Sequence, residues 1–460
     1  MDLICLLFLW VISFCLYKLN KHFWSLCKKE CLRVSTNCFY VDLVFQIFRM
    51  RIVLFYILPA ITRALFLWNN DLLDHVTPSE ITVIYFFELL SHFIYYLVIY
   101  ALLKRNRHDL SLIFDNNKLL NIFAVFTLIL YCYFSITGFS LMGDAEEAPS
   151  DSLWMIKPLM IVVGSVTCFY IFVLGKKYWN KWLVGLAFIT VLLYLIISFF
   201  SGIRGKLFWP ILWMLYCVWI FRKDEIRKYS YFGVAILLFL ALFQGAMTTF
   251  RSDKSADVSD AISALNKKSK KESRSLLNEV DYRFGALTRY SVGFLRMVDR
   301  GYYAGLNPII NSSYSPIPRR FFPDKPVPCS AEGDLYSMGM YLCSNEITKI
   351  ETNMVEFSTA AHAYWELSFW GLVLFSIIPA IYVYFSIRLF RKFGLLGPCF
   401  FMAIMKPWGY NDPKIWVSDI VLQLSQVILI SYILLVVYKK AKKVFLKKRT
   451  VSIDYRRFRT

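Results

Sequence analysis

The chain has 460 residues, of which 58% are hydrophobic, and its net charge at pH 7 is +20. A soluble domain of this length keeps a polar surface, so the composition argues against an ordinary soluble enzyme. The positive charge alone would fit a nucleic-acid partner, but the distribution of Lys and Arg along the chain gives a different explanation.

Apolar runs of about 17 to 25 residues recur along the chain, which is the length a helix needs to cross a bilayer. The first run follows the acidic Asp2 and has no small-residue cleavage site, so we expect a retained helix rather than a signal peptide. The pattern predicts an all-α, polytopic integral membrane protein with about eleven transmembrane helices, at residues 2–17, 40–67, 81–103, 119–141, 154–174, 182–200, 206–221, 229–250, 364–387, 395–406 and 416–438.

Basic residues gather in every second connection between these predicted helices. The basic set comprises 18–36, 104–118, 175–181, 222–228, 388–392 and the tail from Lys439. The opposite short connections, at 68–80, 138–153, 201–205 and 407–415, contain only Arg204 and Lys414 as basic residues. The positive-inside rule therefore predicts a C-terminus in the cytoplasm and an N-terminus outside it. Orientation and anionic lipid explain most of the charge, so no nucleic-acid partner is expected.

Three regions follow from this topology. Residues 1–250 hold the first eight predicted helices, and residues 364–460 hold the last three and the basic tail. Between them, residues 251–363 form a large outer loop that we expect to be partly helical. A membrane protein that places over a hundred residues in water on one side is expected to do its chemistry there.

Within this loop, apolar residues recur at helical spacing from Leu277 to Arg300. Arg289, Arg296 and Arg300 cluster on the opposite face of that predicted helix. Two interpretations stay open at this point. The arginines form the solvated face of an amphipathic helix, or they form a guanidinium row for a phosphate, since Arg binds phosphate through two donors and keeps its charge.

The following segment, 314–326, contains four prolines, which exclude a regular helix or a central strand. Arg319, Arg320 and Lys325 are therefore displayed on a stiff, extended backbone. Such a loop loses little entropy on meeting an anion. A purely structural turn is an equally good interpretation of the prolines.

Arginines also occur near the other predicted helices. Arg204 lies between two glycines in the tight turn 201–206, where the backbone can approach a ligand closely. Arg63 is near the outer end of its predicted helix and is a candidate for the same site. Arg49 and Arg51 either mark the cytoplasmic end of that helix or face a partner, because an arginine in the membrane rarely faces lipid.

His362 and Glu366 are spaced i,i+4 where the chain enters the helix after the loop, so they share one helix face. They form a candidate acid–base pair at the outer membrane boundary, although capping or core roles fit the spacing too. The eleven cysteines show no metal-ligand spacing, so we expect no metal and no cofactor. Cys329 and Cys343 both lie in the outer loop and form a candidate disulfide.

Three elements in this order resemble the Wzy-type O-antigen polymerases. They are Ser-Gly-x-Arg-Gly at 201–205, Ile-Pro-Arg at 317–319 followed by Pro-Asp-Lys-Pro at 323–326, and Glu-Leu-Ser-Phe-Trp-Gly at 366–371. The chain departs from the usual pattern in having Ser368 where an asparagine is expected and in inserting Trp370 before Gly371. The resemblance covers mainly residues 200–375.

The resemblance implies a multi-pass protein of the bacterial inner membrane with its N-terminus in the periplasm. Such a protein polymerises undecaprenyl-diphosphate-linked oligosaccharide repeat units by an inverting glycosyl transfer. Possible partners are a chain-length regulator and a flippase. Cations must stabilise the leaving lipid diphosphate, and a base must take a proton from the acceptor hydroxyl. The candidate cations are Arg63, Arg204, Arg289, Arg319, Arg320 and Lys325, and the candidate base is Glu366 or His362.

Three other functions fit the sequence. An O-antigen ligase shares the architecture and differs only in its acceptor. A lipid-linked oligosaccharide flippase is also polytopic and basic, but it is expected to show internal repeats and little mass outside the membrane. A non-enzymatic assembly partner is the third.

Overall fold

The computed structural model describes residues 2–65, 76–111, 285–306 and 358–391, with residues 189 and 401 as isolated positions. Regular structure in these ranges is entirely helical. The elements are α1 (Asp2–Leu32), α2 (Phe39–Ile52), the π-helical turn η1 (Val53–Ile57), α3 (Leu58–Leu65), α4 (Pro78–Asn106), α13 (Ala286–Asp299) and α16 (Thr359–Phe390).

Four stretches of the described chain are long and apolar enough to cross a membrane: Ile4–Leu32, Phe39–Arg63, Pro78–Asn106 and Thr359–Phe390. They correspond to the first three predicted spans and to the one predicted at 364–387. The other seven predicted spans and most of the outer loop lie outside the described residues.

Two predicted boundaries differ from the observed ones by five residues or more. The predicted helix 2–17 continues through the first basic connection to Leu32, because the Lys residues that end the apolar run are themselves good helix formers. The predicted helix at 364 begins at Thr359, because the Ser358 side chain accepts a hydrogen bond from the Ala361 amide and caps the helix earlier.

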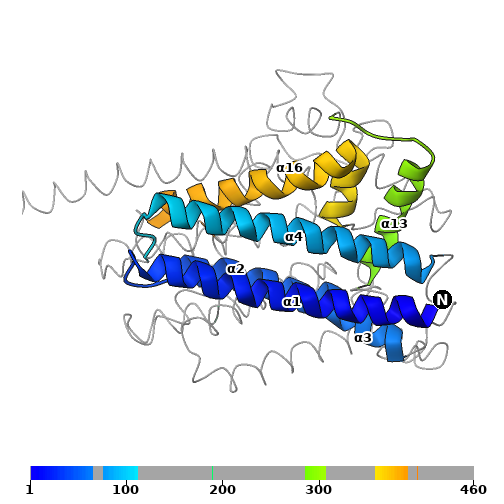
Figure 1. Ribbon diagram of the computed structural model, residues 1–460, viewed down its shortest axis with the longest axis horizontal. Helices are drawn as coiled ribbons and strands as arrows, with labels where there is room; N and C mark the ends of the chain where they lie inside the picture. Colours follow the sequence, from blue (N-terminus) through cyan, green and yellow to red (C-terminus); the bar gives the residue numbers. More distant parts are fainter. Residues whose placement is uncertain are drawn as a thin grey trace, which may run out of the picture.

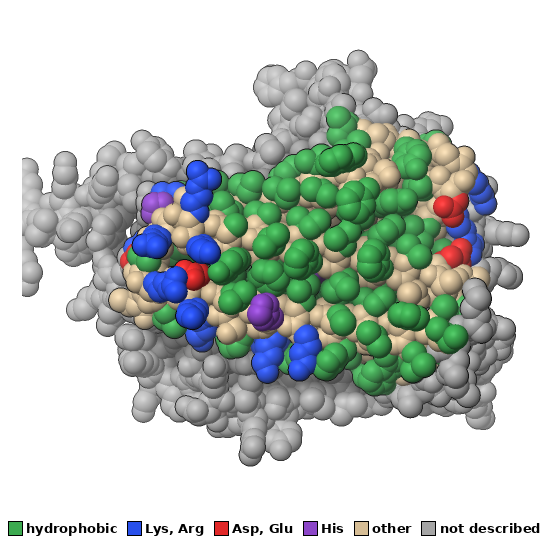
Figure 2. Space-filling view, in the orientation of Figure 1, with side chains coloured by type: hydrophobic (Ala, Val, Ile, Leu, Met, Phe, Trp, Pro, Cys, Tyr) green, Lys and Arg blue, Asp and Glu red, His purple; other side chains and the backbone are tan. Residues whose placement is uncertain are grey.

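The long helices run side by side, with α4 between α1 and the long part of α16 (Figure 1). The ends of α1, α4 and α16 meet at one end of this bundle. There Arg391 forms an ion pair with Asp109, and the Leu110 amide donates to Ser35 in the turn after α1. Lys and Arg side chains gather at this end, which we call the basic end (Figure 2).

At the opposite end, a capping box starts α4. The Thr77 hydroxyl accepts from the Glu80 amide, and the Glu80 carboxylate accepts from the Thr77 amide. Pro78 occupies the first turn, where a missing N–H costs nothing. The start of α4 is thus fixed by local sequence, close to the start of α1 (Figure 1).

The second apolar stretch is one helical rod with a π-helical turn in the middle. A π turn widens the helix and breaks its regular hydrogen bonding. Here the carbonyl of Tyr56 accepts from the Tyr85 hydroxyl at 3.1 Å and from the Ser13 hydroxyl at 3.3 Å. The wide turn therefore joins α1, α4 and η1 at one buried point.

Helix α16 bends sharply after its second turn. Leu367 and Ser368 have non-helical angles, and Ser368 has φ 57° and ψ −142°. Two contacts with α4 show how far the chain turns. Ser358 meets Glu88 and Ser376 meets Ser91, so 18 residues of α16 match three residues of α4, or about 27 Å of straight helix against about 4.5 Å. The first segment of α16, residues 359–366, therefore crosses the bundle axis instead of following α4 (Figure 1).

The bend leaves the last carbonyls of this first segment without their helical partners. A turn after α13 replaces those partners, because the Ala304 amide donates to Trp365 O at 3.2 Å and the Gly305 amide donates to Glu366 O at 3.0 Å. Gly371 then packs on the backbone of Ala363, where an added Cβ would lie 1.8 Å from the carbonyl oxygen. The bend is thus held from both sides.

A broad apolar face covers α1, α4 and α16 between the two ends of the bundle (Figure 2). Its exposed side chains include Phe8 and Phe14 on α1, Phe86 on α4, and Trp370 and Phe385 on α16. Exposed aromatic and aliphatic side chains over this length suit contact with lipid.

Candidate functional site

A platform of two short transverse helices lies at the end of the bundle opposite the basic end. It consists of α13 and the first segment of α16, which pack on each other (Figure 1). The Ser358 amide donates to the Ser291 hydroxyl at 2.6 Å, and the Phe294 ring packs edge-on against His362 with centroids 5.3 Å apart. Ser358 contacts Glu88, which lies ten residues into α4, about 15 Å from its first residue.

His362 and Glu366 form a buried pair inside the platform. Their Nδ1 and Oε1 atoms are 2.9 Å apart, and both side chains are fully buried. The two atoms are close enough for an ion pair, but they are not aligned for a hydrogen bond with each other. The predicted i,i+4 proximity is therefore confirmed. A His–carboxylate contact of this length can pass or hold a proton, and such bonds often align only in the reacting complex.

Arg63 contacts the first turn of α13, and Arg289 is a residue of that turn. Arg63 donates to the Gly285 carbonyl at 3.0 Å and to the Thr288 hydroxyl at 3.3 Å, so it joins α3 to α13. Arg289 lies over the Tyr290 ring, 4.9 Å from its centroid, and is 2% exposed. The structure thus places two of the predicted cations at the same end of α13.

The predicted row of arginines on α13 divides into three different environments. Arg289 is buried, Arg296 forms a two-point ion pair with Glu80 at 2.7 and 3.0 Å, and Arg300 is exposed. The apolar face of the helix is buried as predicted, including Phe294. The interpretation of the three arginines as one solvated helix face is therefore wrong, because the Arg289 side chain is buried in the protein.

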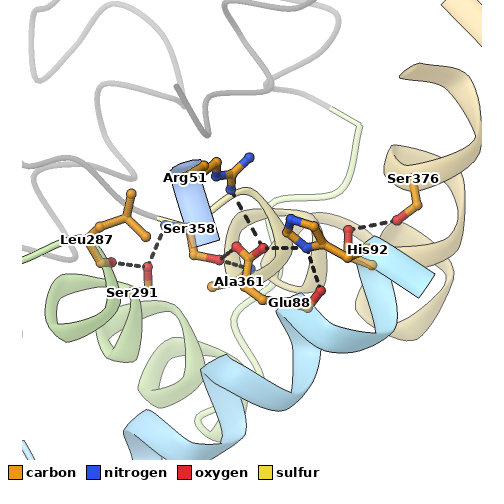
Figure 3. Close-up of polar contacts among 9 residues, drawn as sticks. Arg51, Glu88, His92, Leu287, Ser291, Ser358, Ala361 and Ser376 are labelled. Carbon is orange, nitrogen blue, oxygen red and sulfur yellow. Dashed lines mark hydrogen bonds and ion pairs between the residues drawn. The ribbon is translucent and has the colours of Figure 1, made fainter. Parts of the chain in front are cut away.

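A third cluster centres on Glu88, which the sequence analysis did not select (Figure 3). The Ser358 hydroxyl donates to one carboxylate oxygen of Glu88. The other oxygen lies 3.6 Å from Arg51 Nη2 and 3.4 Å from His92 Nδ1. Glu88 is 1% exposed. The cluster joins α2, α4 and the start of α16.

The two arginines of α2 both lie inside the bundle. Arg51 pairs with Glu88, while Arg49 donates to Asn20 at 3.2 Å and lies over the Trp24 ring. The interpretation that they face partners is confirmed, and the one that they only mark the cytoplasmic end is wrong. Burial of a charge inside a span requires such partners.

The sequence did carry a signal for the Glu88 cluster. Glu88 and His92 are an i,i+4 pair within the apolar run 81–103, with the same spacing as His362 and Glu366. Ionisable residues within a span mark functional sites by default. The partner Ser358 had no comparable signal, because it is 270 residues away in the sequence.

The described residues include four of the predicted site residues, namely Arg63, Arg289, His362 and Glu366. Arg204, Arg319, Arg320 and Lys325 lie outside them, as do Cys329 and Cys343. Arg63 and Arg289 lie at the start of α13, and Phe294 of α13 packs against His362 of the His–Glu pair. In the described ranges, no group of three or more His, Cys, Asp and Glu side chains is placed to hold a metal ion.

These features define a helical protein with several helices able to span a membrane and with ionisable groups buried near one end of the bundle. No family model matches the chain, and no curated protein or solved structure matches it either. Any more particular assignment therefore depends on the motifs and on the chemistry of the platform.

Proposed function

We propose that this protein is an inverting membrane glycosyltransferase. Its substrates are oligosaccharide repeat units linked to undecaprenyl diphosphate, which it polymerises into O-antigen or a related surface polysaccharide at the periplasmic face of the bacterial inner membrane. The basic end then faces the cytoplasm, in line with the positive-inside rule. The proposal rests on the sequence resemblance and on the chemistry of the platform.

The observation that carries the proposal is the buried His362–Glu366 contact of 2.9 Å in the platform, which lies opposite the basic end of the bundle. Glycosyl transfer to a sugar hydroxyl needs a base for the proton that leaves the hydroxyl. Glu366 accepts this proton in our scheme, and His362 orients the carboxylate. Because both side chains are buried, the scheme requires a movement that exposes them to the acceptor.

Departure of the lipid diphosphate requires positive charge. Arg289 is a platform cation for this role, with Arg63 holding the first turn of α13 in place. Arg204, Arg319, Arg320 and Lys325 complete the proposed anion site on sequence grounds. Lipid diphosphate lies at the membrane boundary, the depth expected for a platform that crosses the bundle near one end.

The test is the surface polysaccharide of a deletion strain that carries plasmid-borne variants. Glu366→Gln and His362→Ala are expected to give normal amounts of membrane protein but only single repeat units on the lipid A core. Asp299→Asn, an exposed carboxyl on α13, and His22→Ala, an exposed histidine on α1, serve as matched controls with normal ladders.

Bare core in the deletion strain would contradict polymerisation and indicate a ligase or a flippase instead. Normal ladders from both Glu366→Gln and His362→Ala would remove the proposed base.

The cation assignment is tested by Arg→Lys changes, because Lys keeps the charge but loses the planar two-point donor geometry. Arg204→Lys and Arg319→Lys are expected to give single repeats, while Arg274→Ala leaves a normal ladder. Wild-type ladders from both Lys variants would contradict binding of the diphosphate by these residues.

A further inference from the structure

Glu88 is a buried carboxylate held by Arg51, His92 and Ser358. Its contact with Ser358, the residue that caps α16, joins it to the platform. The question is what a buried carboxylate does at this place, since a charge in a span is costly and needs a compensating role.

The partners of Glu88 divide into two groups with different tasks. Arg51 and His92 approach one carboxylate oxygen from α2 and from the next turn of α4. His92 Nδ1 also lies 2.8 Å from the Glu88 carbonyl, which only accepts, so this nitrogen carries a proton. These groups fix the carboxylate in position. The other oxygen is left to accept from the Ser358 hydroxyl.

Ser358 in turn fixes the first segment of α16. Its side chain accepts from the Ala361 amide, its own amide donates to Ser291 on α13, and its carbonyl accepts from the His362 amide at 3.1 Å. One residue thus links Glu88, α13 and the turn that carries His362 (Figure 3). The segment ends at the bend, where Leu367 and Ser368 have non-helical angles. Ser358 therefore holds its start, and no continuous helix holds its end.

We infer that Glu88 is a positioning residue for the His362–Glu366 pair, acting as the fixed anchor to which Ser358 attaches the first segment of α16. The inference rests on the proposed function for its activity measurement. A small displacement of a catalytic group is enough to matter, since a shift of about 1 Å can lower a rate by on the order of 100-fold.

The structure supplies a matched control for this anchor. Ser91 and Ser376 also join α4 to α16 through hydroxyl groups, 2.8 Å apart. This contact lies beyond the bend, on the long part of α16. Its loss removes a hydrogen bond between the same two helices without touching the platform.

The experiment measures initial polymerisation rates of the purified full-length protein in nanodiscs, with lipid-linked repeat units isolated from the host strain. Ser358→Ala is expected to lower kcat by about 10- to 100-fold with KM unchanged, and Ser358→Thr, which keeps the hydroxyl, restores it. Ser91→Ala is expected to leave kcat unchanged.

Ser358→Ala removes both the contact with Glu88 and the cap of α16. Glu88→Gln changes the contact alone and so distinguishes the two effects. It keeps the volume and one acceptor but loses the charge that Arg51 and His92 hold. We expect about a 10-fold lower kcat, and no further loss when Glu88→Gln is added to Ser358→Ala, because residues acting through one contact are non-additive. Additive losses, or an equal loss in Ser91→Ala, would overturn the inference.

Amide hydrogen exchange over residues 359–366, followed by mass spectrometry, gives a readout that needs no activity. Exchange is expected to be faster in Ser358→Ala and Glu88→Gln than in the wild type or Ser91→Ala. Unchanged exchange in Glu88→Gln contradicts the anchor. Faster exchange in a protein whose wild type makes no polymer would contradict the proposed function and leave the anchor in place.

Discussion

The ion pairs at the basic end and the ion pair of Glu88 lie in opposite surroundings. At the basic end, Lys28–Asp42 and Arg391–Asp109 are partly exposed to solvent. Toward the platform, Arg51–Glu88 is buried. Exposed pairs contribute little, typically 0–1 kcal/mol, whereas a buried pair fixes geometry at a cost in desolvation and is strongly destabilising when broken. The comparison indicates that the buried Arg51–Glu88 pair fixes geometry, whereas the exposed pairs at the basic end contribute little.

The largest effect is expected from breaking the buried pair. Glu88→Ala leaves Arg51 without its carboxylate and should reduce the free energy of unfolding by about 3–5 kcal/mol. Thermal or denaturant unfolding in detergent measures this. Asp42→Ala at the basic end is the matched change, and equal losses at the two ends would contradict the distinction between them.

The second largest loss of stability is expected from a change at the bend in α16. Gly371→Ala places a methyl group 1.8 Å from the Ala363 carbonyl oxygen, and this backbone atom cannot move away cheaply. We expect a loss of about 1–3 kcal/mol in the free energy of unfolding, as for other overpacked sites. Ala380→Gly, a small-residue change beyond the bend, should not alter the exchange of 359–366, whereas Gly371→Ala should accelerate it.

Ser368→Gly is expected to act in the opposite direction. Ser368 has φ 57° and ψ −142°, a conformation that only glycine adopts without strain. Relief of this strain should raise the free energy of unfolding by about 1 kcal/mol. An accompanying fall in kcat would show that the strained bend is needed for activity, and a destabilised variant would contradict the strain.

The smallest effect is expected at Asp109. Burial raises its pKa, but hydrogen bonds from Ser111 and the nearby Arg391 outweigh this and hold the pKa below its ordinary value. A depressed pKa stabilises the fold above the unfolded pKa, and the contribution disappears as pH falls through the folded pKa. Asp109→Asn should therefore cost less than about 1 kcal/mol at pH 7 and nothing at strongly acidic pH. Unfolding measured against pH and salt checks both.

Sequence periodicity predicted the apolar spans at 40–67 and 81–103 because each is a long, nearly uninterrupted apolar run. It also predicted that His362 and Glu366 share a face, because i,i+4 geometry is local. The bend after Glu366 was not predictable in the same way. The segment 364–387 is apolar enough overall to predict one continuous span, and the bend depends on amides supplied by the distant Ala304 and Gly305.

The Glu88 cluster was missed for a related reason. Hydropathy averages over a window, so one Glu and one His in a long apolar run barely lower it. Their spacing was visible, but their partners come from α2 and from the start of α16. Long-range pairing of this kind follows from the packing of several helices, which local pattern does not encode.

The link between Glu88 and Ser358 also has a consequence for biogenesis. The two residues are 270 positions apart, so a ribosome needs on the order of 10 to 50 seconds to make the second after the first. During that time the partners of Glu88 include Arg51, which was made earlier on α2, and His92, which follows one turn later on α4. The early helices thus provide partners for the Glu88 carboxylate before α16 is made. The first segment of α16 is synthesised late and packs against a carboxylate that is already held in place.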